Sequence, residues 1–386
     1  MTRLVTYGFV LASSALGACA HVQDRKEPYA TPEMRRAAIQ RAHVWAPTDV
    51  AAMDLKTGPT GPGAFPPQGT VECQYRDKKM GGATPKFACV VPPDDELKVK
   101  YGKDNGEVYA EVAASRLFWA LGFSAEPTYP VRVVCNGCPP AILHDTDLAS
   151  VQRKLPGVDL DMARMTGWAW PELDLVDPAA GGAPRAQRDA LKLLATFIQH
   201  TDSKPDQQRL ICLPSHADPE VETKTGEKQA KKDEQKEIKK AEKRIEKGKA
   251  PKKGEEPCAD TLMMVHDLGQ TFGHANVFNR SSVGSVNLKE WLRAPVWQDP
   301  AQCIAYLPKS RSGSLESPRI SEEGRQFLAT LLARLTDAQL HDLFEVARFP
   351  QRWDRAQHPE NVATVDQWVD AFKKKRSEVV NHHCPE

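Results

Sequence analysis

The octapeptide His200-Thr201-Asp202-Ser203-Lys204-Pro205-Asp206-Gln207 follows directly on an apolar run and places an acid, a lysine and an amide close together. A second motif, His266-Asp267-Leu268-Gly269, also follows an apolar run and lies beyond a long charged segment. Each motif therefore presents a carboxylate just past an apolar element, at Asp202 and at Asp267. These two acids, in this order, are the strongest chemical signal in the chain.

Apolar periodicity predicts the elements around the two motifs. A helix is expected over Arg188 to His200, and short apolar strands over Arg209 to Leu213 and Leu262 to Val265. Three later helices are expected over Ser321 to Leu335, Asp337 to Ala347 and Val365 to Val380. Thr336 and Gln339 have the spacing of a capping box.

The first half of the chain alternates strand and turn signals before its first long helix. The predicted strands and helix, in chain order, are Gly69 to Arg76, Lys86 to Val91, Glu96 to Tyr101, the helix Val108 to Leu121, and Thr128 to Val134. Gly81-Gly82 and Pro92-Pro93 supply the turns between the strands. An earlier helix is predicted from Thr31-Pro32-Glu33 to about Val44, followed by a Pro/Gly-rich loop. The resulting order around the long helix is β-β-β-α-β.

The two motifs resemble the catalytic loop, H-R-D-x-K-x-x-N, and the metal-binding D-F-G of protein-kinase-like enzymes. The segment Ala110-Glu111-Val112-Ala113-Ala114, with Leu117 and Leu121-Gly122, resembles the A-E-x-A-A…L…L-G helix of atypical kinases. These include phosphatidylinositol-kinase-like, HipA-like and secretory-pathway kinases. The resemblance implies an α+β, two-lobed fold with a small β-rich N-lobe and a mostly helical C-lobe.

The resemblance also implies roles for residues of the predicted N-lobe. Strand alternation puts Lys98 and Lys100 on one face, and Lys100 would contact the phosphates of ATP. Glu111 would hold that lysine, with Glu107 as the alternative. Gly81 and Gly82 would let backbone amides approach a phosphate, although no G-x-G-x-x-G precedes Lys100.

In the first motif Asp202 would orient the acceptor hydroxyl and take its proton, and Lys204 would steady the transferred group. Asp267 would bind Mg²⁺ or Mn²⁺ together with Gln207. The family has Asn at the position of Gln207, and this departure matters because magnesium tolerates poor geometry badly. Asp206 and Gln208 are possible substitutes. His200 is expected to hold the loop by hydrogen bonds.

Each of these residues also has a purely structural interpretation. The lysines could be solvent-facing strand residues, and Glu111 could be a surface charge on its helix. Gly81-Gly82 is equally what a tight turn needs, and Asp267 and Gly269 are common turn formers. The tryptophans are expected to serve packing rather than substrate binding: Trp168, Trp170, Trp291 and Trp297.

The N-terminus has the pattern of an export signal. Arg3 precedes an apolar run over Leu4 to Ala18 that is short for a membrane span. The run ends in Leu16-Gly17-Ala18-Cys19, which resembles a bacterial lipobox and implies lipidation of Cys19. Ala20 follows instead of Asp, which implies an anchor at the periplasmic face of the outer membrane. The alternative is an ordinary secretory signal with a chance cysteine.

Net charge is +1, which argues against strong attraction to nucleic acid. The segment Lys224 to Glu256 holds 13 Lys or Arg and 8 Asp or Glu, so the remaining chain is net negative. This low-complexity segment has too few apolar residues to bury a face, and we expect an exposed spacer. Binding to an anionic surface is the alternative.

Nine cysteines are consistent with export to an oxidising compartment, since eight remain after Cys19. Their spacing suggests the disulfide pairs Cys73 with Cys89, Cys135 with Cys138, Cys212 with Cys258, and Cys303 with Cys384. The second pair forms C-N-G-C, a spacing that can be redox-active at a helix N-terminus. Because Pro139-Pro140 follows, no helix is expected there, and a structural disulfide is favoured. Zinc would need further ligands from His382, His383 or Cys384, which nothing in the sequence places nearby.

The expected organisation is a signal peptide over 1–18, an N-terminal helix and linker over 19–68, an N-lobe over 69–150, and a C-lobe over 151–386 with a charged insertion at 222–256. The leading hypothesis is a lipid-anchored phosphotransferase that uses ATP and a divalent metal on an unknown acceptor. The rival is a catalytically inactive kinase-like lipoprotein that binds an envelope partner or ligand. Thiol-disulfide exchange through Cys135 and Cys138 is a third class.

Overall fold

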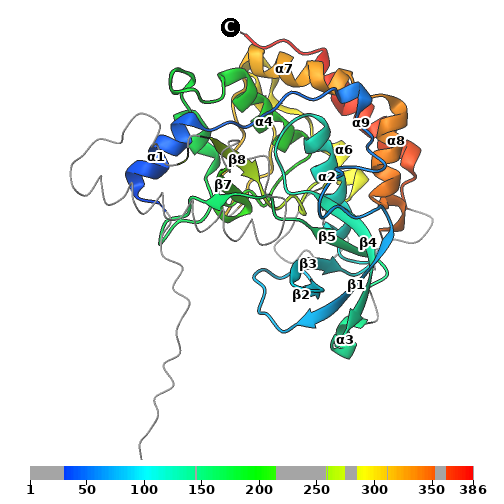
Figure 1. Ribbon diagram of the computed structural model, residues 1–386. Coiled ribbons are helices and arrows are strands. Elements are labelled where there is room, and N and C mark those ends of the chain that lie inside the picture. The colour runs from blue at the N-terminus through cyan, green and yellow to red at the C-terminus, as the bar shows by residue number, and fades with distance from the viewer. Residues whose placement is uncertain are drawn as a thin grey trace, which may run out of the picture.

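The computed structural model describes residues 30–143, 146–213, 258, 260–273, 285–310, 312–352 and 362–385. The chain is a mixed α+β protein with a five-stranded sheet at one end and most of its helices at the other (Figure 1). The predicted α+β class is therefore confirmed, whereas the two-lobed kinase-like arrangement stays a prediction. The signal segment with Cys19 and the charged insertion at 222–256 lie outside the described residues.

The five-stranded sheet closes on itself in the order β1-β2-β3-β5-β4. Its strands are β1 (Gly69–Arg76), β2 (Lys86–Val91), β3 (Asp95–Tyr101), β4 (Thr128–Asn136) and β5 (Ala149–Gln152). β1 and β4 pair in parallel, and the other neighbours pair antiparallel. Apolar side chains fill the interior as a small separate core that includes Val71, Phe87, Val99, Val131 and Val151. The first four strands match the sequence prediction closely.

Strand β5 was not predicted, because its apolar and polar side chains alternate over only four residues, which is a weak strand signal. Pairing decides its conformation instead. Val151 lies opposite Val99 of β3 and Tyr129 of β4, so β5 bridges two strands that the sequence did identify. This strand closes the sheet and brings Gln152 beside Lys98.

Helix α2 (Glu107–Ala120) is buried on almost every side. It packs against β3, β4 and β5 on one side and against α8 (Asp337–Val346) on the other. Carboxylates on such a helix cannot reach bulk water and must find partners inside the protein. The helix starts one residue before its predicted start, so that Glu107 belongs to its first turn.

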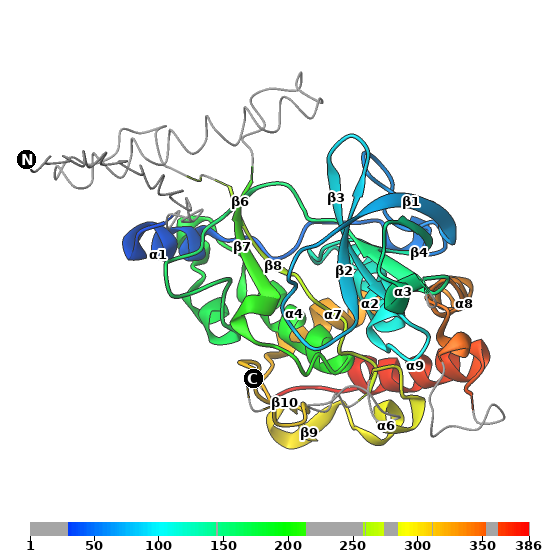
Figure 2. The ribbon, with the colours of Figure 1, turned by 90° about the horizontal axis from the view of Figure 1, so that it is seen from below.

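A second sheet has the order β6-β7-β8 and is antiparallel. Its strands are β6 (Val158–Asp159), β7 (Gln208–Cys212) and β8 (Thr261–Val265). Figure 2 shows β7 and β8 side by side, with the closed sheet to their right. β7 starts directly after the first motif, and β8 ends directly before the second. The sheet therefore holds the two motifs next to each other.

Helix α1 (Pro32–Arg41) ends three residues before its predicted end at Val44. Ala42 turns to extended backbone, and the His43 amide then donates to the Thr261 carbonyl at 2.8 Å. Pairing with the edge of β8 therefore overrides the helical propensity of residues 42–44. The predicted N-cap is confirmed, since Thr31 accepts a hydrogen bond from the Met34 amide.

The large core lies among the C-terminal helices and holds Trp168, Trp170 and Trp291 almost fully buried, which confirms their packing role. The helices are α4 (Arg185–Phe197), α6 (Leu288–Arg293), α7 (Glu322–Ala333), α8 and α9 (Val365–Val380). One-turn 3-10 segments are Val50–Ala52, Pro178–Ala180, Pro205–Gln207, Pro300–Gln302 and Phe349–Gln351, and a longer one is Trp170–Leu175. The remaining pair of short strands is β9 (Trp297–Asp299) and β10 (Ile304–Ala305). The capping box of Thr336 and Gln339 is confirmed.

All four suggested cysteine pairs form disulfides: Cys73–Cys89, Cys135–Cys138, Cys212–Cys258 and Cys303–Cys384. One detail of the prediction is wrong, because the four-residue helix α3 (Pro140–Leu143) does start just beyond Cys138. Proline fits the first helical turn, where its missing N–H is not needed. In the described part of the chain, every helix is too short or too polar to cross a bilayer.

Candidate active site

Lys100 is a buried cation surrounded by three carboxylates. Its side chain is 1% exposed, and its ammonium nitrogen lies 2.9 Å from Glu107 Oε2, 3.0 Å from Glu111 Oε2 and 3.1 Å from Asp267 Oδ1. Burial by itself would lower the pKa of Lys100, but Asp267, Glu107 and Glu111 together hold that pKa well above its usual value. Lys100 is therefore positively charged in the folded protein.

Three separate elements bring Lys100 and these carboxylates to one point. Lys100 is the penultimate residue of β3. Glu107 and Glu111 are four residues apart on α2, so both lie on the helix face that meets β3. Asp267 comes from the turn after β8, where the Gly269 amide donates to Asp267 Oδ1 at 3.1 Å. The sequence proposed Glu111 with Glu107 as the alternative, and the structure brings both to the lysine.

Lys100, Glu107, Glu111 and Asp267 together form the Lys100 cluster. It holds three carboxylates around one ammonium, so its interior carries more negative than positive charge. Lys98 lies 3.6 Å from Asp267 Oδ2 and is 21% exposed, so it offsets part of this excess from the solvent side. Burial acts to raise the pKa of Asp267, but Lys100 and Lys98 outweigh it and hold the pKa well below its usual value. Burial raises the pKa of Glu111, whose Oε2 is at ion-pair distance from Lys100 without an aligned hydrogen bond. Such a site favours a further cation near Asp267.

Gln152 links this cluster to the second motif, and the sequence analysis missed it. Its amide oxygen accepts a hydrogen bond from Lys98 at 2.8 Å, and its amide nitrogen donates to Glu111 Oε1 at 3.2 Å and to the His266 carbonyl. Gln152 therefore fixes the positions of Lys98 and Glu111 relative to the turn that carries Asp267. Gln152 reaches Lys98 because β5 pairs with β3, and nothing in the sequence indicates which strand β5 pairs with.

The loop between β1 and β2 reaches the same cluster. Thr84 Oγ1 donates to Glu107 Oε1 at 2.6 Å. Gly82 has a φ of +80°, and a Cβ placed there would lie 2.8 Å from the Lys86 ammonium. Lys86 is the cross-strand neighbour of Lys100, so the loop with Gly81 and Gly82 adjoins the lysine-bearing face of β2 and β3.

In the first motif, Asp202 contacts both Lys204 and Gln207. Lys204 lies 3.2 Å from Asp202 Oδ1, and the Gln207 amide nitrogen donates to Asp202 Oδ2 at 3.1 Å. Burial raises the pKa of the Asp202 carboxyl, although Lys204 opposes the shift. An acid with a raised pKa accepts a proton more readily than an ordinary surface aspartate.

Gln207 joins the two motifs through its backbone. Its carbonyl accepts hydrogen bonds from the amides of His266 at 2.8 Å and Asp267 at 3.1 Å. Asp202 and Asp267 are therefore held in a fixed relation by one short hydrogen-bonded bridge. The resemblance placed a metal-binding side chain at Gln207, and the structure shows that its amide nitrogen is engaged by Asp202.

His200 is fully buried, and neither ring nitrogen has a hydrogen-bond partner among the residues that the structure describes. The expected hydrogen bonds from this ring to the loop are therefore not observed there. Burial lowers the pKa of His200 to about 4, with Asp267 acting weakly against the shift. The ring is neutral at physiological pH and packs 6.1 Å from the Trp170 ring.

The oxygen donors near Asp267 are of the type that Mg²⁺ or Mn²⁺ prefers. Asp267 supplies a carboxylate, and Gln207 has an amide oxygen with no hydrogen bond among the described residues. Gln208 is buried, and its amide oxygen has no partner there either. Asp206 is exposed. The donor set therefore fits a hard divalent cation in chemical type.

No known family model matches the sequence, and no curated protein matches it. Among solved structures, the chain is similar to the Helicobacter pylori proinflammatory kinase CtkA, with 10% sequence identity and a TM-score of 0.40. The match covers 80% of this chain and 94% of that one. A similarity of this size leaves the fold family of the chain open.

Proposed function

We propose that this chain is a kinase-like phosphotransferase that uses ATP and a divalent metal ion on an acceptor not yet known. The observation that carries the proposal is the Lys100 ammonium held among Glu107, Glu111 and Asp267. A lysine paired to a helix glutamate and adjoining a metal-binding aspartate is the arrangement that protein kinases use for phosphoryl transfer. We further propose the two-lobed division at residues 69–150 and 151–386.

The residues have distinct roles in this proposal. Lys100 would contact the nucleotide's phosphates, and the loop with Gly81 and Gly82 would cover them. Asp267 would hold the metal ion with Gln207, and that ion would neutralise phosphate charge when bound. Asp202 would accept the proton of the acceptor hydroxyl, which its raised pKa favours. Lys204, 3.2 Å from Asp202, would steady the transferred group.

The proposed setting is the cell envelope. The lipobox-like segment ending at Cys19 supports a lipid anchor at the periplasmic face of the outer membrane. The four disulfides support an oxidising compartment. The partners would then be the membrane, reached through the lipid, and an acceptor in the envelope, with no role for nucleic acid.

One observation favours an inactive kinase-like binding protein as a second candidate. The Gln207 amide nitrogen is bonded to Asp202, and the Asp267 carboxylate is bonded to Lys100. If these contacts persist when nucleotide is present, they hold the Gln207 and Asp267 side chains in orientations that hinder binding of a shared metal ion. The chain would then keep its fold and use the same surface to bind an envelope partner.

The deciding experiment is a thermal-shift titration of the purified mature protein with ATP, with and without Mg²⁺ or Mn²⁺. A ligand that binds the folded state raises the melting temperature by mass action. We expect a metal-dependent rise of a few degrees that is lost in Asp267→Asn and kept in Asp370→Asn, whose side chain is exposed on α9. No shift with any nucleotide or metal would favour the inactive binding protein.

A further inference from the structure

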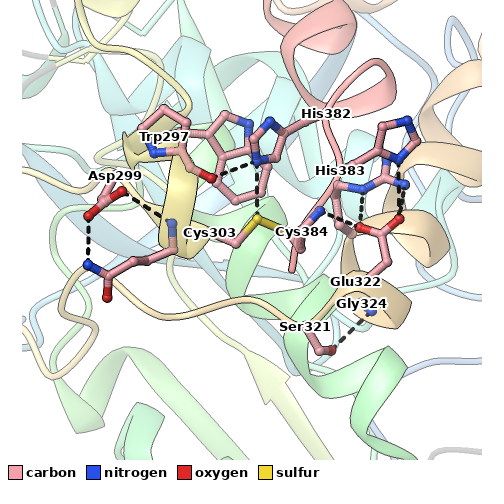
Figure 3. The surroundings of a disulfide bond; sticks show 12 residues. Trp297, Asp299, Cys303, Ser321, Glu322, Gly324, His382, His383 and Cys384 are labelled. Carbon is pink, nitrogen blue, oxygen red and sulfur yellow. Dashed lines mark hydrogen bonds and ion pairs between the residues drawn. A yellow bond between two sulfur atoms is a disulfide. The ribbon is translucent and has the colours of Figure 1, made fainter. Parts of the chain in front are cut away.

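Three metal-ligating side chains converge near the C-terminus, far from the Lys100 cluster. Cys303, His382 and Cys384 each place a ligand atom within 4.8 Å of the other two. Figure 3 shows the His382 ring above the disulfide of Cys303 and Cys384. His382 Nε2 lies 3.1 Å from Cys303 Sγ. Cys303, His382 and Cys384 are the one group of three His, Cys, Asp or Glu residues in the described part of the chain whose ligand atoms lie this close together.

The surrounding structure fixes each of the three residues. The Cys303 amide donates to the Pro300 carbonyl, and its own carbonyl accepts from the Ile320 amide at 2.9 Å. The Cys384 amide donates to Glu322 Oε2 at 2.8 Å. The His382 ring stacks on Trp297 with the ring centroids 4.5 Å apart. The site is therefore partly preorganised, which favours tight binding of a ligand.

We propose that reduction of the Cys303–Cys384 disulfide creates a zinc site whose ligands are the two sulfurs and His382 Nε2. A dithiol reductant transfers two electrons and two protons to the disulfide and becomes a disulfide itself. Zn²⁺ then displaces the protons of both thiols, so that two thiolates and a neutral imidazole hold the ion. The segments that carry Cys303 and Cys384 would thus be joined by a zinc ion in place of the disulfide.

Zinc coordination geometry can be met from the observed positions. Bond lengths of about 2.3 Å to sulfur and about 2.0 Å to nitrogen put tetrahedral ligands about 3.5 to 3.8 Å apart. The nitrogen-to-sulfur distance is already 3.1 Å, and the Cα atoms of the two cysteines are 5.5 Å apart. Rotation of the cysteine side chains to other staggered conformations separates the sulfurs once their bond is broken.

The imidazole proton must also move for zinc to bind. His382 Nε2 lies 3.1 Å from the Pro300 carbonyl, which can only accept, so the oxidised form carries a proton on Nε2. Zinc takes the Nε2 lone pair, and the proton is transferred through solvent to Nδ1, so the imidazole stays neutral. The Pro300 carbonyl is exposed there, so water can replace the lost donor. Three protein ligands leave one coordination position open, as catalytic zinc sites do.

His383 supplies a matched control. Its ring lies beside Glu322, with Nδ1 3.7 Å from Glu322 Oε1, and its side chain is 84% exposed. Figure 3 shows this ring on the side of Cys384 away from the His382 ring. His382→Ala and His383→Ala each remove one imidazole and keep every cysteine. A difference between them therefore reports this site and not the thiols of the other disulfides.

The test measures Zn²⁺ retained by the mature protein after gel filtration, before and after mild reduction with a dithiol that is then removed. We expect no zinc in the oxidised protein and about one ion in the reduced protein. His382→Ala should weaken binding at least ~10-fold, while His383→Ala should match wild type. Co²⁺ in place of Zn²⁺ should give thiolate charge-transfer absorption that His382→Ala changes.

Two outcomes would overturn the proposal. Reduced wild-type protein that retains no zinc would show that the three groups do not form a site. Equal zinc retention by the His382 and His383 variants would show that the bound zinc belongs to other thiols or to an unfolded chain. Circular dichroism of the reduced protein shows whether the chain is still folded, and so distinguishes zinc bound by other thiols from zinc bound by an unfolded chain. In both cases His382 is not a zinc ligand.

Discussion

The Lys100 ammonium lies 3.1 Å from Asp267 Oδ1, although 167 residues separate the two in the chain. Lys100 is the penultimate residue of a strand in the closed sheet, and Asp267 follows a strand of the second sheet. Their contact joins the two sheets through a buried charge pair. A buried pair of this kind costs desolvation energy and is therefore weak evidence for stability alone. The pair is the contact on which the proposed ATP site rests.

Replacing Lys100 by alanine should destabilise the protein strongly. The variant leaves Glu107 and Glu111 buried, and Asp267 largely buried, without their shared cation, and such a loss typically costs about 3–5 kcal/mol. Urea denaturation of the variant and wild type measures the difference. Lys79→Ala is the control, because Lys79 is exposed, and its free energy of unfolding should stay within about 0.5 kcal/mol of wild type. An equally small change in Lys100→Ala would show that the cluster is not electrostatically coupled.

The residues of the Lys100 cluster differ in how far the sequence could reveal them. Lys100, Glu111 and Asp267 stand in motifs that resemble those of atypical kinases, and that resemblance implied that they belong to one site. Gln152 could not, because its contacts depend on β5, whose conformation is imposed by pairing with β3 and β4.

The same contrast holds for the fold. The capping box at Thr336 and the hairpin of β1 and β2 rest on local signals and were predicted correctly. The end of α1 at Arg41 was not predicted correctly, because a long-range hydrogen bond from the His43 amide to the Thr261 carbonyl determines it. The Cys303 and His382 contact is likewise non-local: it joins residues 79 apart, and no sequence spacing indicates it.

Gly82 and its neighbour Gly81 should respond differently to alanine. Gly82 has a φ of +80°, which an L side chain adopts at a cost of about 1 kcal/mol, and its Cβ would also displace the Lys86 ammonium. A Cβ at Gly81 meets no atom within 4 Å. Gly82→Ala should therefore lower the free energy of unfolding by about 1 kcal/mol, with Gly81→Ala close to neutral. Equal effects in urea denaturation would contradict the loop conformation. If this loop covers phosphates, ATP affinity should fall in Gly82→Ala as well.

Stability should fall as the pH drops from about 6.5 to about 4 because of His200. Burial lowers its folded-state pKa to about 4, while the unfolded chain takes up the proton near pH 6.5. Within that window the unfolded state binds more protons, so the free energy of unfolding decreases by roughly 3 kcal/mol in total. Urea midpoints measured at intervals from pH 7.5 to pH 4 give the slope.

His200→Leu should flatten this pH dependence, since leucine cannot take up a proton. His341→Leu is the matched control, because the His341 side chain is 46% exposed and its replacement leaves the burial of His200 unchanged. The control should keep the slope of the wild-type protein. A His200→Leu slope that is equally steep would mean that the carboxylates, and not this buried ring, govern the acid sensitivity.

Asp202→Asn and Asp267→Asn should separate proton acceptance from metal binding. Asn at position 202 keeps the shape and the contact with Gln207 but cannot take a proton, so transfer should fall about 10²–10⁴-fold while ATP binding persists. Asn at position 267 removes a charge next to Lys100 and should abolish the metal-dependent part of ATP binding. A thermal-shift titration measures ATP binding, and release of ADP, with or without an added acceptor, measures phosphoryl transfer.

If Asp202→Asn loses ATP binding as fully as Asp267→Asn, the raised pKa of Asp202 reflects a structural role in the loop and not proton transfer. If both variants bind ATP like wild type and no ADP is released by any of them, the inactive binding protein becomes the better account of the Lys100 cluster.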